Sequence, residues 1–133
     1  MKTVKYGIIG LGNMGSGHIA SFFKEGNVPN AEVVAIADRK PDKVQRICDK
    51  YPQATFDCYS EGADLIDKAD VDAVIVAVPH YQHPELCIRA LKRGLNVICE
   101  KPAGVYTKQA KEMMAVAAES KSLFTMMFNQ RTN

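Results

Sequence analysis

The stretch VKYGIIGLGNMGSG, residues 4–17, decides the fold of this 133-residue chain. Its first part, Val4–Gly10, is an apolar run typical of a buried strand, and a helix is predicted to begin directly after it. Between the two lies the pattern G-x-G-x-x-G, at Gly10, Gly12 and Gly15. Gly10 permits a tight turn, Gly12 lets backbone N–H groups approach a pyrophosphate, and Gly15 lets the helix pack close to the strand. The pattern is weak alone, because a simple glycine turn would look the same.

An acidic residue at the end of the next strand strengthens this interpretation. The apolar segment Glu32–Ala37 is followed by Asp38, at about the distance of twenty residues at which a carboxylate can accept both ribose hydroxyls of an adenosine. The sequence therefore predicts a dinucleotide site made by Asp38 and by the glycine loop, whose residues are Gly10, Gly12, Asn13, Met14 and Gly15.

The same strand end bears on the choice of cofactor. Asp38 would repel a 2′-phosphate, which favours NAD over NADP. Arg39 leaves NADP open, because a guanidinium beside the ribose could bind that phosphate, although it could equally be a solvated surface residue. We expect NAD as the cofactor, with Arg39 beside it.

Strands and helices alternate along the whole chain with short connections, and residues 71–78 (VDAVIVAV) read as a central strand covered on both faces. This pattern predicts an α/β fold, a doubly wound parallel Rossmann sheet of six strands with helices on both faces. We expect one domain over residues 1–133. The expected strands are Val4–Gly10, Glu32–Ala37, Thr55–Tyr59, Val71–Val78, Leu95–Cys99 and Ser122–Phe128. The expected helices run from Asn13 to Glu25, from Pro41, from an N-cap at Ser60, from near Pro84 to Gly94, and from Thr107. The last of these is expected to bury the face that carries Ala110, Met113, Met114 and Ala117.

The composition excludes several classes of protein. Apolar residues make up 47% of the chain, charged residues 24%, and the net charge is +2, without a basic run that would suggest nucleic acid or a membrane surface. The longest apolar stretch, residues 73–79, is too short to span a bilayer. No signal peptide precedes the first strand, so we expect a cytoplasmic protein. The four cysteines are expected to be buried, reduced thiols, and with three histidines they form no metal site of familiar spacing.

Three later strand ends are polar where the strands before them are apolar. These ends read Pro79-His80-Tyr81-Gln82-His83, Glu100-Lys101-Pro102 and Asn129-Gln130-Arg131. In a doubly wound sheet, ligands bind outside the carboxyl ends of the strands, so the three ends should face the same crevice as the glycine loop. A polar end is also what any strand needs on reaching solvent.

At this point the chain resembles the N-terminal domain of the glucose–fructose oxidoreductase / inositol dehydrogenase (Gfo/Idh/MocA) family. The resemblance rests on GLGNMGSGH, the AD that ends the second strand, VPHYQHPEL, GLNVICEKPAG and MFNQR, and it covers nearly the whole chain. It implies an NAD(P)-dependent oxidoreductase that transfers a hydride between nicotinamide and a hydroxyl carbon of a sugar, polyol or inositol-like substrate.

The resemblance gives Lys101 a catalytic role. It resembles the family lysine near the nicotinamide and the reacting hydroxyl, where the lysine assists proton transfer or polarises the oxygen. A lysine beside a cationic ring and partly desolvated would have a lowered pKa, which suits acid–base work. Glu100 and Pro102 are expected to set the turn around it. The alternative is a solvated lysine at a strand end.

The resemblance also implies roles for other residues, and some of these residues have a second possible role. Pro79 and His80 resemble the family's Pro-Asn pair at the cofactor, and His80 departs from the commoner asparagine. His83 matches a frequent family histidine and could either contact the cofactor or cap a helix. His18 is expected to be a packed core residue. Arg131 could reach a substrate or cofactor group.

Members of this family normally continue into a second α/β domain that supplies most substrate contacts and the oligomer interface. The resemblance therefore implies a C-terminal substrate and oligomerisation domain that is absent from this chain, a full-length protein that is a homo-oligomer, and a 133-residue chain that is inactive alone. The alternative is a free-standing nucleotide-sensing Rossmann module without chemistry. Lys101 favours the enzyme, since a sensor needs no proton-transfer group beside the nicotinamide.

Overall fold

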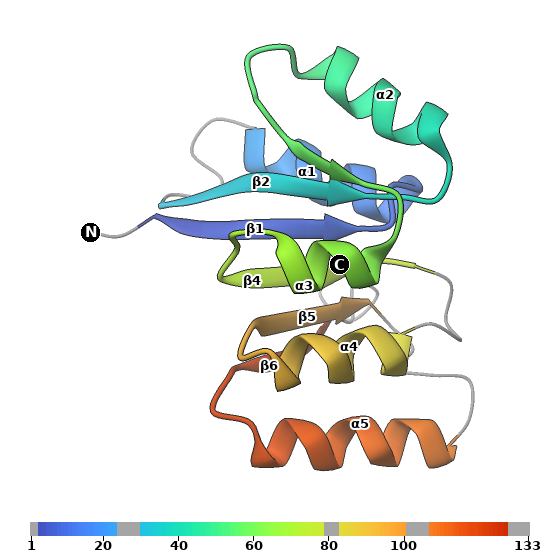
Figure 1. Ribbon diagram of the computed structural model, residues 1–133, viewed down its shortest axis with the longest axis vertical. Helices are drawn as coiled ribbons and strands as arrows, with labels where there is room; N and C mark the ends of the chain where they lie inside the picture. Colours follow the sequence, from blue (N-terminus) through green and yellow to red (C-terminus); the bar gives the residue numbers. More distant parts are fainter. Residues whose placement is uncertain (1–2, 24–29, 79–82, 101–106, 128–133) are drawn as a thin grey trace.

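The computed structural model describes residues 3–23, 30–78, 83–100 and 107–127. Strands and helices alternate through all four segments (Figure 1). None of the helices within these segments is long and apolar enough to cross a membrane. The strands are β1 Val4–Ile9, β2 Ala31–Ala37, β3 Asp57–Tyr59, β4 Ala73–Val76, β5 Asn96–Glu100 and β6 Phe124–Met127. The helices are α1 Asn13–Phe23, α2 Pro41–Lys50, α3 Gly62–Lys68, α4 His83–Lys92 and α5 Thr107–Glu119.

The strands form one parallel six-stranded sheet in the order β3-β2-β1-β4-β5-β6. Each strand joins the next through a helix, as parallel strands require. The chain moves outward from β1 to β3, returns to the centre at β4, and moves outward again on the other side. The predicted doubly wound Rossmann sheet is therefore confirmed, and its strand order reverses between β1 and β4, where such sheets bind ligands.

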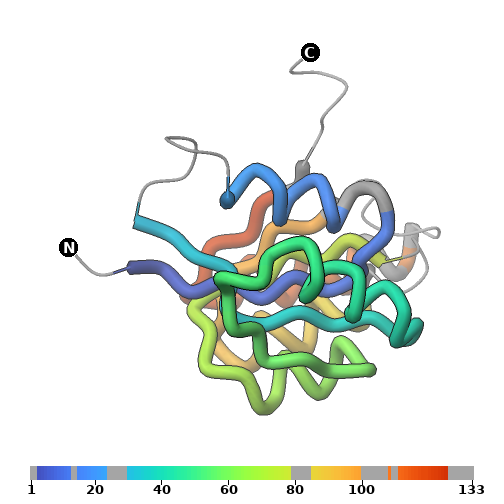
Figure 2. The backbone as a smooth tube through the Cα atoms, turned by 90° about the horizontal axis from the view of Figure 1, so that it is seen from above, coloured from blue at the N-terminus to red at the C-terminus, as the bar shows by residue number. Residues whose placement is uncertain are grey.

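Helices cover both faces of the sheet, as predicted, because neighbouring residues of a strand point to opposite faces. Ile8 is fully buried against α1 and α2 in one cluster, with Ile19, Ile36 and Ile47. Its neighbour Ile9 is buried in the other cluster, which α3, α4 and α5 complete. Figure 2 shows α1 and α3 on opposite sides of β1 and β2.

Three expectations about local structure were wrong. Ser60 does not cap α3, which begins at Gly62 with Glu61 in the capping position and no side-chain cap bond. Met114 is 53% exposed, because α5 lies at the end of its layer and covers only the narrow stripe that includes Met113. Cys48 is only half-buried and Cys58 is exposed, whereas Cys87 and Cys99 are buried as expected. Cys58 is exposed because its strand, β3, is an edge strand of the sheet.

Candidate functional site

A cavity of about 480 Å³ lies at the carboxyl ends of β1, β2 and β4. It sits at the reversal of strand order, and its volume is within the range of pockets that hold small molecules. The cavity is bounded by Ile9 and Ala37 at the ends of two strands and by Ala77 just beyond a third. The charged side chains in its lining are Asp38, Arg39, Lys40, Lys43, Glu61 and Glu85.

The glycine turn packs directly against the exit of β4. Gly10 has φ +95°, a backbone conformation that residues with a side chain rarely adopt. Its N–H donates to the carbonyl of Ala37 at 2.9 Å, and the N–H of Ala77 donates to the carbonyl of Ile9 at 2.8 Å. A methyl group on Gly10 would lie 2.5 Å from the carbonyl oxygen of Ala77. The turn is therefore held by backbone on two sides, which leaves no space for a side chain.

The other two glycines of the pattern have different surroundings. A methyl group on Gly15 would overlap the carbonyl oxygen of Gly10, so α1 can approach β1 only with glycine here. Gly12 lines the cavity, and among the described residues the only atom within 4 Å of a methyl group built on it is Lys43 Nζ, at 4.0 Å. Gly10 and Gly15 thus meet the packing demands expected of them, and Gly12 leaves its backbone open to the cavity.

Asp38 is held in place by the backbone on both sides. Its Oδ2 accepts from the N–H of Leu11 at 2.8 Å, and its Oδ1 accepts from the N–H of Lys40 at 2.8 Å. A carboxylate has about four acceptor sites, so both oxygens keep capacity for ligand hydroxyls. Asp38 thereby links the glycine turn to the start of α2 and still faces the cavity.

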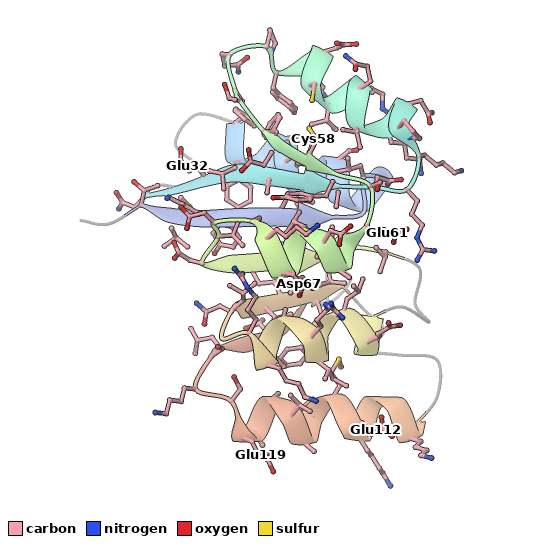
Figure 3. The ribbon with its side chains drawn as sticks, viewed as in Figure 1. Glu32, Cys58, Glu61, Asp67, Glu112 and Glu119 are labelled. Atoms are coloured by element: carbon pink, nitrogen blue, oxygen red, sulfur yellow. The ribbon has the colours of Figure 1, made fainter. Side chains whose placement is uncertain are left out.

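Arg39 makes an ion pair that the sequence analysis did not anticipate. Its Nε donates to Glu61 Oε2 at 3.0 Å, and both side chains are exposed. Figure 3 shows Glu61 at the end of the sheet opposite Glu32. The two residues are 22 positions apart, so no local spacing rule connects them. The available signal was topological: Glu61 follows β3, and all strand ends of a parallel sheet open on one edge.

Lys43 is a second residue of the cavity that the sequence did not predict. It lies in the first turn of α2, and its ammonium is close to Gly12 at the mouth of the glycine turn. A cation in this place suits a phosphate held by the loop backbone. Its signal was again topological, because α2 starts just beyond Asp38 at the same edge of the sheet.

The remaining predicted residues are placed only in part. Backbone alone is described for Asn13 and Met14 in α1, for His83 at the start of α4 and for Glu100 at the end of β5. Pro79, His80, Lys101, Pro102 and Arg131 lie outside the described residues. Val78 and the first turn of α4, with Glu85 and Leu86, line the cavity next to these segments. His18 is half-buried on α1.

Within the described segments, no group of three or more His, Cys, Asp or Glu side chains is arranged to hold a metal ion. The cavity offers backbone donors beside a glycine turn, an anchored carboxylate and nearby cations. These groups fit a ligand with ribose hydroxyls and phosphates.

Comparison with known proteins agrees with this chemistry. Residues 4–128 match the family described as "Oxidoreductase family, NAD-binding Rossmann fold" (GFO_IDH_MocA). The chain is 36% identical over 124 residues to the 2,7-anhydro-N-acetylneuraminate hydratase of Mediterraneibacter gnavus, covering 93% of this chain and 31% of that protein. It is 33% identical over 120 residues to the inositol 2-dehydrogenase of Salmonella paratyphi B, covering 90% of this chain and 34% of that protein.

Solved structures give the same result. The myo-inositol 2-dehydrogenase of Lactobacillus plantarum superposes with a TM-score of 0.91 at 28% identity, over 99% of this chain and 38% of that one. The scyllo-inositol dehydrogenase of Lactobacillus casei, solved with NAD(H) and scyllo-inositol, gives 0.89 at 27% identity over the same shares. The chain spans about a third of the length of the curated relatives it matches.

Proposed function

The chain belongs to the Gfo/Idh/MocA oxidoreductase family, as an NAD-binding Rossmann domain, and from this premise we propose that it is the cofactor-binding part of a longer dehydrogenase. The substrate class that we propose is a sugar, polyol or inositol-like alcohol, in line with the relatives named inositol 2-dehydrogenase. Because the chain spans about a third of those relatives, a further domain would supply most substrate contacts and the interface of a homo-oligomer.

The observation that carries the proposal is the joint placement of the glycine turn, Asp38 and Lys43 around one cavity. The adenosine ribose would lie against Asp38, whose oxygens are already oriented by the backbone of Leu11 and Lys40. The pyrophosphate would lie over Gly12 at the N-terminus of α1, with Lys43 on its open side. When bound, NAD would supply the hydride acceptor, while these residues hold and orient it.

The same geometry supports NAD over NADP. Asp38 and Glu61 place two carboxylates at the ribose end of the cavity, and Glu61 engages the guanidinium of Arg39. A 2′-phosphate would meet both negative charges and would have to displace Glu61 from Arg39. We therefore propose that Arg39 stays paired with Glu61 when NAD is bound. Glu61 thus keeps the guanidinium away from the position of a 2′-phosphate.

Calorimetric titration of the 133-residue chain with NAD(H) and NADP(H) tests the proposal. NAD(H) should bind more tightly. Glu61→Gln should raise NADP(H) affinity by roughly two- to fivefold, the scale of an exposed ion pair. Glu32 is an exposed glutamate at the other end of the sheet, so Glu32→Gln is the matched control and should leave both cofactor affinities unchanged. Equal affinities in the unmodified chain would overturn the NAD preference, and an absence of binding to either cofactor would overturn the site.

For the chemical step we propose Lys101 as the group that moves the proton of the reacting hydroxyl, because in the sequence it comes directly after β5, and the cavity lies at the carboxyl ends of the parallel strands. In the full-length protein, Lys101→Ala should lower kcat by about 10²–10⁴-fold and leave NAD affinity nearly unchanged. Lys101→Arg should not restore activity, since a guanidinium stays protonated. Near-normal kcat in Lys101→Ala would show that the lysine serves another purpose.

A sensing module without chemistry is the competing function. The two functions differ in the length of the native open reading frame, because a dehydrogenase of this family needs a substrate domain of about two hundred residues. The 133-residue chain alone should show no turnover with inositols or sugars under either function, so activity of the isolated chain would contradict both. We place the protein in the cytoplasm, in keeping with its four free cysteines.

A further inference from the structure

Two pairs of cysteines lie in contact within the described residues, and they differ sharply in exposure. Cys87 of α4 and Cys99 of β5 are both fully buried in the core, and they are hydrogen-bonded to each other. Cys48 of α2 and Cys58 of β3 form the second pair, with 3.7 Å between their sulfur atoms. In this pair Cys48 is half-buried and Cys58 is exposed.

The second pair joins two separate elements at the edge of the sheet. Cys58 lies in β3, the outermost strand on its side, and points toward α2 (Figure 3). Its thiol donates to the carbonyl of Phe56 at 3.6 Å, so local backbone fixes its direction. A disulfide has an S–S distance of about 2.05 Å. The two sulfurs must therefore approach each other by roughly 1.7 Å for a disulfide to form.

We propose that Cys48 and Cys58 are a redox-modification site, which closes to a disulfide by exchange with a small disulfide such as oxidised glutathione. The exposed Cys58 loses its proton, attacks one glutathione sulfur and breaks the glutathione disulfide, so one glutathione thiol leaves and takes up a proton. Cys48 then loses its proton and attacks the Cys58 sulfur, which releases the second glutathione thiol. The two cysteines are oxidised, and one oxidised glutathione is reduced to two thiols.

The surroundings of the thiols set how readily each pair can react. Partial burial, with the hydrogen bond to Cys48 and the nearby charge of Asp57, raises the pKa of Cys58 to about 11. Only the thiolate attacks a disulfide, so the attack by Cys58 is slow at neutral pH. The hydrogen bond to Cys99, together with burial, holds the pKa of Cys87 far above its usual range. That buried pair is closed to solvent and therefore stays reduced.

The location gives the modification a functional setting. The same α2 that carries Cys48 places Lys43 at the cavity, and the residues just after β3 place Glu61 there. The disulfide would link α2 to β3, the two elements beside the ribose side of the cavity.

The test is to incubate the native chain with excess oxidised glutathione, then count free thiols after unfolding and digest the protein without reductant. We expect two of the four thiols to be lost, a peptide pair that joins Cys48 to Cys58, and full reversal by dithiothreitol. The cross-link should raise the Tm by roughly 5–15 °C, because it constrains the unfolded chain. Four retained thiols, or a link between Cys87 and Cys99, would overturn the proposal.

Serine variants separate exchange from cross-linking. Cys48→Ser should stop at a mixed disulfide between glutathione and Cys58, and Cys58→Ser should give no cross-link. Cys87→Ser is the matched control from the buried pair and should still form the link between Cys48 and Cys58. A stable glutathione adduct on Cys58 in the unmodified chain would show that Cys48 does not resolve it, which contradicts the proposal.

Discussion

The turns that follow β1 and α4 each contain a glycine in the left-handed region, and they differ in what surrounds it. Gly10 has φ +95° and Gly94 has φ +89°. A methyl group on Gly10 would meet the backbone of Ala77 at 2.5 Å, whereas one on Gly94 would meet no atom of the described residues within 4 Å. Glycine at Gly94 serves only the local end of a helix. At Gly10, glycine is also needed for tertiary packing, because the backbone just beyond β4 lies against this turn.

The largest effect is expected at Gly15, where the turn meets α1. Gly15→Ala should lower the free energy of unfolding by about 3 kcal/mol or more, because the new methyl group overlaps the backbone carbonyl of Gly10 and no flexible side chain can yield. Urea denaturation monitored by circular dichroism measures this. A loss below about 1 kcal/mol would show that α1 can shift away from β1 easily.

Gly10→Ala is expected to have the next largest effect on stability. Backbone strain in the left-handed conformation costs about 1–2 kcal/mol, and the contact with Ala77 adds to it, so we expect about 2–3 kcal/mol in total. The same denaturation experiment applies. If Gly10→Ala and Gly94→Ala lost equal stability, the difference between the two turns would be one of conformation alone.

Asp38→Ala tests the link between the turn and the ligand. It removes the acceptor of the Leu11 and Lys40 N–H groups and the proposed ribose contact together. We expect about 1–2 kcal/mol of lost stability and a 10- to 100-fold loss of NAD affinity, the usual scale of hydrogen bonds to a charged group. Asp49→Ala, an exposed aspartate at the far end of α2, is the control. Unchanged NAD affinity in Asp38→Ala would remove Asp38 from the site.

Much of this fold could be predicted from the sequence, because its strongest signals are local. The apolar run of β1 and the loop between Gly10 and Gly15 fix strand, turn and helix within a few residues of each other. The alternation of strands and helices then leaves a doubly wound sheet as the natural arrangement. The end of α4 was equally readable, from basic residues followed by Gly94.

The parts that could not be predicted depend on contacts between distant segments. Glu61 approaches Arg39 only after β3 has paired with β2. Cys48 and Cys58 meet only when α2 folds back along the sheet. The exposure of Met114 depends on which neighbours α5 lacks at the end of its layer, which helical spacing alone does not reveal.

Gly94→Ala tests the less crowded of the two glycine turns. Only the left-handed backbone opposes the substitution, because the space around Gly94 is open. We expect a loss of about 1 kcal/mol in the free energy of unfolding, and unchanged NAD affinity, since the turn lies at the opposite end of the sheet from the cavity. A loss as large as that of Gly10→Ala would reveal a packing role that the described contacts do not contain.

The smallest effect is expected at Gly17, and it has the opposite sign. Gly17 is exposed within α1, two residues beyond Gly15, and within the described part of the chain no atom lies within 4 Å of a methyl group built on it. Alanine restricts the unfolded chain and favours the helix, so Gly17→Ala should raise the free energy of unfolding by about 0.5–1 kcal/mol. Thermal and urea denaturation beside Gly15→Ala measure the contrast within one helix. If Gly17→Ala destabilised the chain, α1 would depart from helical geometry at its second turn, and the tight packing would extend beyond Gly10 and Gly15.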